Sequence, residues 1–188
     1  MTSLPGTDQS DADLIAVDFA VLFDRHAVAV HRYLARRIGV TVADDLLAQT
    51  FLVAFERRGN YDRTRPDARP WLYGIATNLL RRHQREEIRQ YQAWARTGVD
   101  SILGDCHADR VAATVDADAW SGSLAAALAV LKPPDREVLL LFAWCELSYS
   151  EIAEALDIAV GTVRSRLHRA RQTVRAALPA TPSLITGD

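Results

Sequence analysis

Apolar side chains recur at three- and four-residue steps through two long blocks of this sequence, and that spacing constrains the fold more than any other feature. In the first block, one helix face would carry Phe19, Leu22, Phe23, His26, Val30, Tyr33 and Leu34. Strands would instead show strict alternation of apolar and polar residues. The 188 residues include only 9 Gly and 7 Pro, which also favours helices. We therefore predict an all-α protein.

Breaks in this periodicity divide the chain into five segments. We predict an acidic disordered leader over residues 1–18, a helical domain over 19–96, an acidic linker over 97–120, a second helical domain over 121–178 and a disordered tail over 179–188. The linker lacks amphipathic spacing. It contains one basic residue, Arg110, and five acidic ones: Asp100, Asp105, Asp109, Asp116 and Asp118. We expect this linker to be flexible, so the sequence predicts two small helical domains on a tether.

The sequence also argues against secretion and against insertion into a membrane. The leader carries four aspartates and no basic start, which argues against a signal peptide. The longest apolar runs, 124–131 and 138–144, are much shorter than a membrane-spanning helix. Cys106 and Cys145 lie far apart in sequence, and we interpret them as free thiols. We therefore expect a cytoplasmic protein without membrane insertion.

An enzyme is one rival class, and its usual motifs are missing from the sequence. The chain has no phosphate-binding GxxxxGK[ST], no GxSxG, no HExxH and no CxxC pair. Its five histidines share no ligand spacing. We predict no catalytic residue, no metal site and no cofactor.

The sharpest motif is a helix-turn-helix within residues 147–174. Ser148 and Glu151 fit an S-x-x-E capping box, which fixes the start of a short first helix. A turn containing Gly161 follows, and a second helix is expected from about Thr162. The apolar side of this second helix would carry Val163, Leu167, Ala170 and Val174.

The opposite side of the second helix has the chemistry of a DNA-reading surface. At about 100° per residue, Arg164, Ser165, His168, Arg169 and Gln172 point away from the apolar stripe. Residues 162–175 contain no acidic side chain to neutralise Arg164 or Arg169. Arginine can bond both O6 and N7 of guanine, while neighbouring arginine side chains hold the phosphates of the DNA backbone. We predict DNA contacts from Thr162, Arg164, Ser165, Arg166, His168 and Arg169, although a charged helix face can also be simply solvated.

The motif VGTVRSRLHRAR at 160–171 closely resembles region 4 of extracytoplasmic-function (ECF) sigma factors, which belong to the sigma-70 superfamily. The preceding LKPPDREVLLLFAWCELSYSEIAEAL resembles the helices that lead into it. The first block is independently similar to sigma region 2: its start is FDRHAVAVHRYLARRIG, its middle ADDLLAQTFLVAFE and its end RPWLYGIATNLLRRHQR. Two matches in the right order are more specific than either one alone. Together they cover residues 19–178.

This resemblance implies where RNA polymerase and the −35 promoter element bind. In the family, the middle helix of region 2 docks on the coiled coil of the largest catalytic polymerase subunit. The family pattern there is close to D-L-x-Q-E-x-F, and this chain departs from it with Asp45, Leu46, Ala48, Gln49 and Phe51. We still expect polar contacts to polymerase from Asp44, Asp45, Gln49, Arg57 and Arg58. By the same resemblance, the arginine-rich helix of region 4 reads the −35 element.

The end of the first block implies capture of the −10 promoter element. Aromatic residues beside arginines suit melted DNA, because nucleobases stack on the aromatic rings while the arginines hold phosphates. By resemblance, the loop before Trp71 receives a base flipped from the −10 element, and the helix around Asn78 borders the opened strand. The predicted contacts are Asn60, Trp71, Tyr73, Asn78, Arg81, Arg82 and Arg85. For Trp71 and Tyr73 the alternative is a place in the apolar core.

The sequence thus predicts a sigma factor that directs RNA polymerase core to promoters and promotes DNA opening. The resemblance implies polymerase core, duplex −35 DNA and single-stranded −10 DNA as partners, together with an anti-sigma protein in many family members. The main alternative is a one-component regulator that binds duplex operator DNA through the helix-turn-helix. A regulator should bind its operator alone, whereas this class of sigma factor usually needs polymerase. A helical interaction protein without DNA contact leaves the arginine-rich helix unexplained.

Overall fold

The computed structural model describes residues 10–96 and 126–177, and within them it contains helices and no strand. The first part holds α1 (Asp11–Val17), α2 (Phe19–Ile38), α3 (Val40–Arg57), the 3-10 turn η1 (Arg58–Asn60) and α4 (Arg69–Arg96). The second part holds a helical segment at 126–130, then α7 (Pro133–Trp144), α8 (Tyr149–Leu156) and α9 (Val160–Ala177). The all-α prediction is confirmed, and the predicted linker and tail lie outside the described residues.

Local capping explains where α2 begins and ends. The Asp18 side chain accepts a hydrogen bond from the backbone N–H of Val21, which satisfies one of the free amides at the start of α2. Gly39 ends this helix with a φ of 85°, a value that favours glycine, and its N–H donates to the Ala35 carbonyl. Helix α3 then starts directly at Val40 and packs back on α2. The result is an antiparallel helix pair with a very tight corner.

Helix α4 packs against this pair and completes the core of the first domain. Leu22, Leu34, Leu72 and Leu80 have no exposed surface. One polar contact is buried among them, since the Tyr33 hydroxyl lies 3.0 Å from the hydroxyl oxygen of Thr77. Because a hydroxyl buried without a partner costs about 1–3 kcal/mol, this pairing fixes the register of α2 on α4.

The N-terminal helix α1 corrects the prediction of a disordered leader over residues 1–18. Residues 11–17 are helical, and Leu14 and Ile15 are buried. Two of the four aspartates that suggested disorder, Asp11 and Asp13, lie in the first turn of this helix, where negative charge is favoured by the helix dipole. Ser10 caps the helix by accepting the N–H of Asp13. Residues 1–9 lie outside the described residues.

The second domain forms around the helix-turn-helix. The capping box is confirmed: the Ser148 side chain accepts the N–H of Glu151, and the Glu151 side chain accepts the N–H of Ser148. Asp157 ends α8 in the left-handed region at φ 51°, a conformation that aspartate tolerates better than most residues. Helix α9 begins at Val160, slightly before the predicted start, and buries Val163, Leu167 and Ala170.

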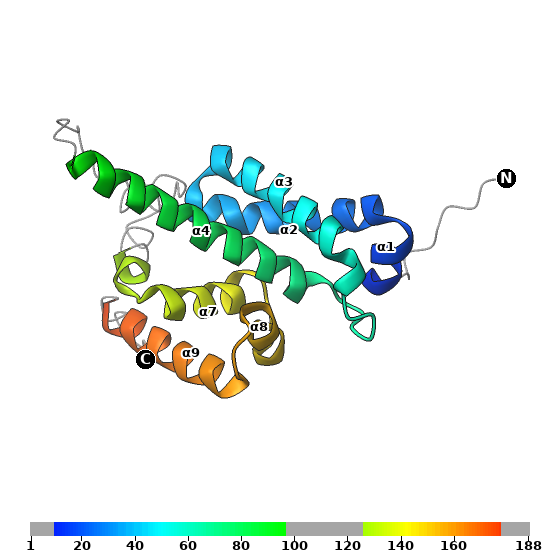
Figure 1. Cartoon of the computed structure of the whole chain (residues 1–188). Coiled ribbons are helices and arrows are strands. Elements are labelled where there is room, and N and C mark those ends of the chain that lie inside the picture. The colour runs from blue at the N-terminus through cyan, green and yellow to red at the C-terminus, as the bar shows by residue number, and fades with distance from the viewer. Residues whose placement is uncertain (1–9, 97–125, 178–188) are drawn as a thin grey trace, which may run out of the picture.

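The two domains pack against each other along α4, which lies between α2 and α3 on one side and the second domain on the other (Figure 1). The closest approach is at Gly74, where a Cβ atom would lie 2.6 Å from the carbonyl oxygen of Ala155 in α8. Ion pairs join Arg65 to Glu154 and Arg81 to Glu137 across the same interface. The structure therefore describes a closed arrangement of the two domains.

Candidate nucleic-acid interface

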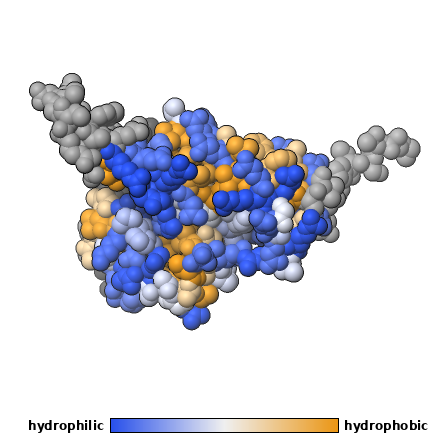
Figure 2. All heavy atoms as spheres, viewed as in Figure 1, coloured by the Kyte–Doolittle hydropathy of each residue, from blue (hydrophilic) through white to orange (hydrophobic). Residues whose placement is uncertain are grey.

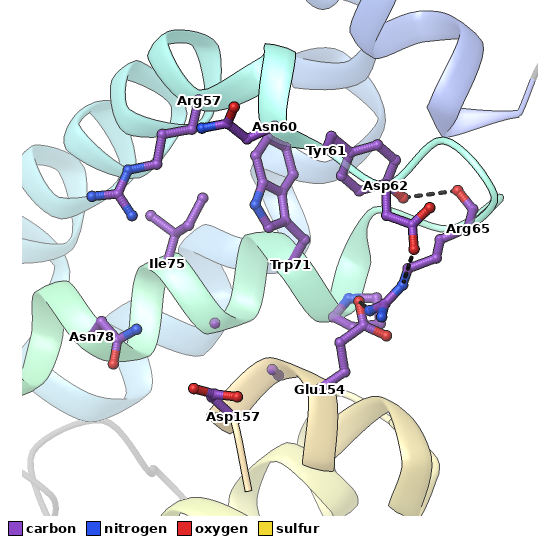
Figure 3. Close-up of a pocket in the computed structure, with 13 residues that line it drawn as sticks. Arg57, Asn60, Tyr61, Asp62, Arg65, Trp71, Ile75, Asn78, Glu154 and Asp157 are labelled. Carbon is purple, nitrogen blue, oxygen red and sulfur yellow. Dashed lines mark hydrogen bonds and ion pairs between the residues drawn. The ribbon is translucent and has the colours of Figure 1, made fainter.

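A cavity of about 320 Å³ opens at the junction of η1, the following loop, α4 and α8. Trp71 reaches from α4 towards Asn60, and Glu154 of α8 and Asp157 at the end of α8 close the opposite side (Figure 3). The Trp71 and Tyr61 rings lie 5.0 Å apart at a tilt of 54°. The complete wall is formed by Arg57, Asn60, Tyr61, Asp62, Arg65, Pro70, Trp71, Gly74, Ile75, Asn78, Glu154, Ala155 and Asp157.

The loop that borders this cavity, residues 61–68, is held in place by its own side chains. The Tyr61 hydroxyl lies 2.9 Å from the Arg65 carbonyl and 3.1 Å from the Asp67 carbonyl. Burial raises the pKa of this phenol well above its usual range, and nearby carboxylates raise it further. Asp62 accepts both the N–H and the hydroxyl of Thr64. The loop is thus a fixed wall for the cavity.

Three of the residues predicted to contact the −10 element lie together at this cavity: Asn60, Trp71 and Asn78. Arg82 and Arg85 lie further along α4 with exposed side chains. The Arg82 guanidinium donates to Glu86 at 2.8 Å, and the Arg85 Nε donates to the Arg81 carbonyl at 3.2 Å. Both remain accessible from solvent in this arrangement.

Tyr73 and Arg81 differ from the prediction. Tyr73 is buried, and its ring meets the Tyr33 ring edge-on with the centroids 5.5 Å apart. Burial raises the pKa of its hydroxyl above the usual range, and neighbouring Cys145 raises it further. Since a buried ring cannot stack on a base, the core interpretation fits Tyr73. Arg81 is half-buried, and its Nε donates to Glu137 of α7 at 2.7 Å; this arginine faces the second domain.

On α9, the predicted outward face is exposed. Arg164, Ser165, His168 and Arg169 are exposed, whereas Thr162 and Arg166 are half-buried on the flanks. The expectation that no acidic residue neutralises Arg169 is wrong. Its guanidinium contacts the Asp135 carboxylate of α7 at 2.9 and 3.2 Å. Because Asp135 lies 34 residues earlier in the chain, the local sequence of the helix gave no sign of it.

The residues predicted to contact polymerase separate into two groups. Asp44, Asp45 and Gln49 are exposed on the outer face of α3, with an Asp44 carboxylate oxygen 3.0 Å from His31 Nε2. Arg57 instead lines the cavity, and Arg58 lies over the Phe55 ring at 3.9 Å from its centroid.

The outer face of α3 also carries apolar residues that the sequence analysis missed. Leu52 and Phe55 are 57% and 45% exposed. They follow Asp45 and Gln49 at helical spacing, so this spacing could have revealed them. Apolar patches are visible among hydrophilic side chains over the upper part of the molecule, where α2 and α3 lie (Figure 2). Exposed apolar side chains of this size on one face are typical of a protein-binding surface.

No helix within residues 10–96 and 126–177 is both long and apolar enough to span a bilayer. Over the same ranges, no group of three or more His, Cys, Asp and Glu side chains could hold a metal ion.

Comparison with known proteins agrees with this geometry. The model of sigma-70 region 2 matches residues 22–90, and the model of sigma-70 region 4 matches residues 121–174. The chain is 35% identical over 167 residues to the RNA polymerase sigma factor CarQ of Myxococcus xanthus, covering 85% of this chain and 88% of CarQ. It is 30% identical over 179 residues to the ECF RNA polymerase sigma factor SigL of Mycobacterium tuberculosis, covering 95% and 96%.

A solved structure shows a similar arrangement of helices. CnrH in complex with the cytosolic domain of CnrY aligns with a TM-score of 0.62 and 27% identity, covering 88% of this chain and 92% of CnrH. Matches to both regions in the right order, at near full length, leave one assignment: the chain belongs to the ECF sigma factors of the sigma-70 family.

Proposed function

We propose that this sigma factor captures a base of the −10 strand in the cavity beside Trp71 and reads the −35 element with the exposed face of α9. As a sigma factor it directs RNA polymerase core to specific promoters and promotes DNA opening. The observation that carries the finer assignment is the convergence of Asn60, Trp71 and Asn78 on one cavity.

The chemistry of this cavity suits an unpaired base. Trp71 offers a ring for stacking, and the side-chain amides of Asn60 and Asn78 offer donors and acceptors to a base edge. Arg57 lies in the same wall, where its guanidinium can pair with a phosphate. Unstacking a base costs a few kcal/mol, which these contacts would offset. Opening is then driven by binding and needs no ATP.

The exposed face of α9 suits a duplex major groove. Arg164, Ser165 and His168 project from the first three turns, and the buried stripe of Val163 and Leu167 fixes their direction. The N-terminal end of a recognition helix is the part that enters the groove in helix-turn-helix proteins. Thr162 and Arg166 on the flanks are placed for the phosphates on either side.

We assign polymerase docking to the outer face of α3. This face combines Asp45 and Gln49 with the exposed apolar side chains of Leu52 and Phe55. A mixture of apolar anchors and polar groups is typical of the centre of a protein interface. We remove Arg57 from the predicted docking set, because it lines the cavity. Arg58 stays in the set, because it lies over the ring of Phe55 on this same face.

The remaining parts of the function follow from the family. A sigma factor acts as a subunit of polymerase and has no catalytic centre of its own, so we assign no enzymatic activity. We place the protein in the cytosol, where its polymerase and promoter partners are. An anti-sigma protein is an expected partner, since the sigma factor RpoE of Bartonella quintana, which has a similar fold, was solved in complex with the anti-sigma factor NepR.

Promoter opening by reconstituted holoenzyme tests the −10 assignment. We expect Trp71→Ala and Asn78→Ala to lower the permanganate reactivity of unpaired thymines while binding to polymerase core stays normal. Arg89→Ala is the matched control, because Arg89 is an exposed arginine further along the same helix. If both cavity variants open a promoter as fully as wild type does, the cavity does not capture the strand.

A further inference from the structure

The carboxylate of Asp11 is buried between α1, α2 and the loop that borders the cavity. Asp11 is 4% exposed. One carboxylate oxygen accepts a hydrogen bond from Arg25 Nη1 at 2.7 Å. The other lies 2.8 Å from His26 Nε2 and accepts the backbone N–H of Ala68 at 2.8 Å. A buried aspartate with this many partners has a structural or functional task, because burying an unpaired charge is very costly.

Two bonds from this one residue hold the end of the loop. The Asp11 backbone N–H donates to the Pro66 carbonyl at 2.9 Å, and its side chain holds Ala68. Ala68 is also the residue whose carbonyl accepts the N–H of Leu72 in the first turn of α4. The carboxylate therefore satisfies the backbone amide of the residue that precedes α4, as the Glu side chain of a capping box does, but from 57 residues away.

The clamped segment carries part of the cavity wall. Tyr61, Asp62 and Arg65 come from the loop itself, and Trp71 lies in the first turn of α4. A shift of this segment would move the Trp71 ring relative to Asn60, which is on the far side of the loop. Positions at a binding site must be held to within about 0.5 Å to act together.

We propose that Asp11 is a positioning residue for −10 strand capture: it clamps Pro66 and Ala68, and thereby holds the loop and Trp71 in the geometry that receives the base. This inference rests on the proposed function of the cavity. It gives α1, a helix outside both regions matched by the family models, a part in promoter recognition.

The charge state of Asp11 suits a permanent clamp. Burial raises the pKa of the carboxyl, but the hydrogen bonds from His26 and Ala68 outweigh burial and lower this pKa to about 2. The carboxylate therefore stays ionised throughout the physiological pH range, and the clamp needs no titration to form.

Three variants in α1 separate positioning from general stability. Asp11→Ala leaves Ala68, Arg25 and His26 without this acceptor. Asp11→Asn keeps a carbonyl oxygen that can still accept the Ala68 N–H. Asp13→Ala is the matched control, because Asp13 is exposed in the same helical turn and bonds to Ser10. Each variant is assembled with polymerase core into holoenzyme.

The measured quantities are affinity for a single-stranded −10 oligonucleotide, affinity for polymerase core, and hydrogen exchange of the loop amides. We expect Asp11→Ala to weaken oligonucleotide binding about tenfold, corresponding to the loss of one buried hydrogen bond to a charged group. Asp11→Asn should lose less oligonucleotide affinity than Asp11→Ala, and Asp13→Ala should lose none. Exchange should increase at residues 61–68 but not in α2 or α3, and core affinity should stay unchanged.

Two results would overturn the inference. The first is an Asp11→Ala protein that binds the oligonucleotide as tightly as wild type does. If Asp11→Ala does not fold, the corresponding result is an Asp11→Asn protein that keeps wild-type affinity although hydrogen exchange of its loop amides has increased. The second is an equal loss of core and oligonucleotide binding, which would mean general destabilisation. Trp71→Ala keeps this test distinct from that of the proposed function: if Trp71→Ala also binds the oligonucleotide normally, the assignment of the cavity has failed.

Discussion

At the scale of single residues, two exposed arginines of α9 have different surroundings. Arg164 makes no ion pair within the described ranges, whereas Arg169 is held by Asp135. The hydrogen bond to Asp135 and its negative charge raise the pKa of the Arg169 guanidinium. A side chain already paired must give up that partner, or share it, before it bonds to a base. The two arginines should therefore contribute unequally to −35 recognition.

We expect Arg164→Ala to weaken binding of holoenzyme to a −35 duplex by about 1–3 kcal/mol and to relax the preference at particular base pairs. Arg169→Ala should weaken this binding less. In wild type, Arg169 must give up its contact with Asp135 to bond to DNA, so its net contribution to DNA binding is smaller. Competition between −35 sequence variants at one fixed salt concentration measures both effects. Equal losses across all variants would indicate that Arg164 holds a phosphate and reads no base.

Asp11 gives a pH-dependent prediction for stability. The folded-state pKa of this carboxyl is lowered from 3.8 to about 2, so its stabilisation is present above pH 3.8 and is lost as the pH falls towards 2. We expect Asp11→Asn to be less stable than wild type at pH 5 by about 1–2 kcal/mol, allowing for solvent screening. That difference in the free energy of unfolding should shrink between pH 4 and pH 2. A difference that stays constant in urea unfolding over this range would contradict the charged clamp.

At the scale of helices, the docking of α4 on α8 depends on the absence of a side chain at Gly74. An added Cβ would meet the Ala155 carbonyl oxygen at 2.6 Å, and a backbone atom cannot move aside as a flexible side chain can. The helix itself would prefer alanine at this interior position by about 1 kcal/mol. The two effects oppose each other, so the sign of the change reports whether the helices dock.

We expect Gly74→Ala to be less stable than wild type and to give a larger radius of gyration in solution scattering. Gly161→Ala is the control, since an added Cβ there meets nothing within 4 Å and should leave the dimensions unchanged. A Gly74→Ala protein that is more stable and equally compact would show that α4 and α8 are apart in solution.

Local sequence patterns predict some features of these helices and miss others. The capping box of Ser148 and Glu151 and the exposed face around Arg164 could be predicted because both depend on residues within one or two helical turns. Helix α1 could not, because a short helix with several aspartates resembles a solvated leader until its apolar side finds a core. Its stability comes from packing of Leu14 and Ile15.

At the scale of the whole molecule, the cavity lies where the two domains meet. Glu154 of α8 and Asp157 at the end of this helix form part of its wall, and Glu154 pairs with Arg65 of the loop. The sequence predicted both domains but not this junction. The partners of Arg81 and Arg65 lie in the other domain, and no local pattern specifies such pairs. In the closed arrangement Arg81 pairs with Glu137, so the predicted DNA contact of Arg81 would require this pair to open, and it stays a prediction.

Because Glu154, Ala155 and Asp157 line the cavity from the second domain, we expect a DNA strand to reach Trp71 fully only after α8 moves away from α4. We expect a reducible crosslinker between the thiols of Arg65→Cys and Glu154→Cys, in a chain whose own cysteines are replaced, to hold the domains closed. The crosslinked protein should fail to bind the −10 oligonucleotide as holoenzyme, and reduction should restore binding to the level of the double variant without the crosslinker. Equal binding before and after reduction would mean that the cavity accepts DNA without domain opening.

The central claim, that this chain is a sigma factor with promoter specificity of its own, is tested most directly by transcription in vitro with polymerase core and genomic DNA fragments. The account predicts transcripts that start at a limited set of positions and share two upstream sequence elements. The start sites should disappear when the chain is omitted. No specific transcript with core, together with protection of a duplex operator by the chain alone, would contradict the account and indicate a one-component regulator.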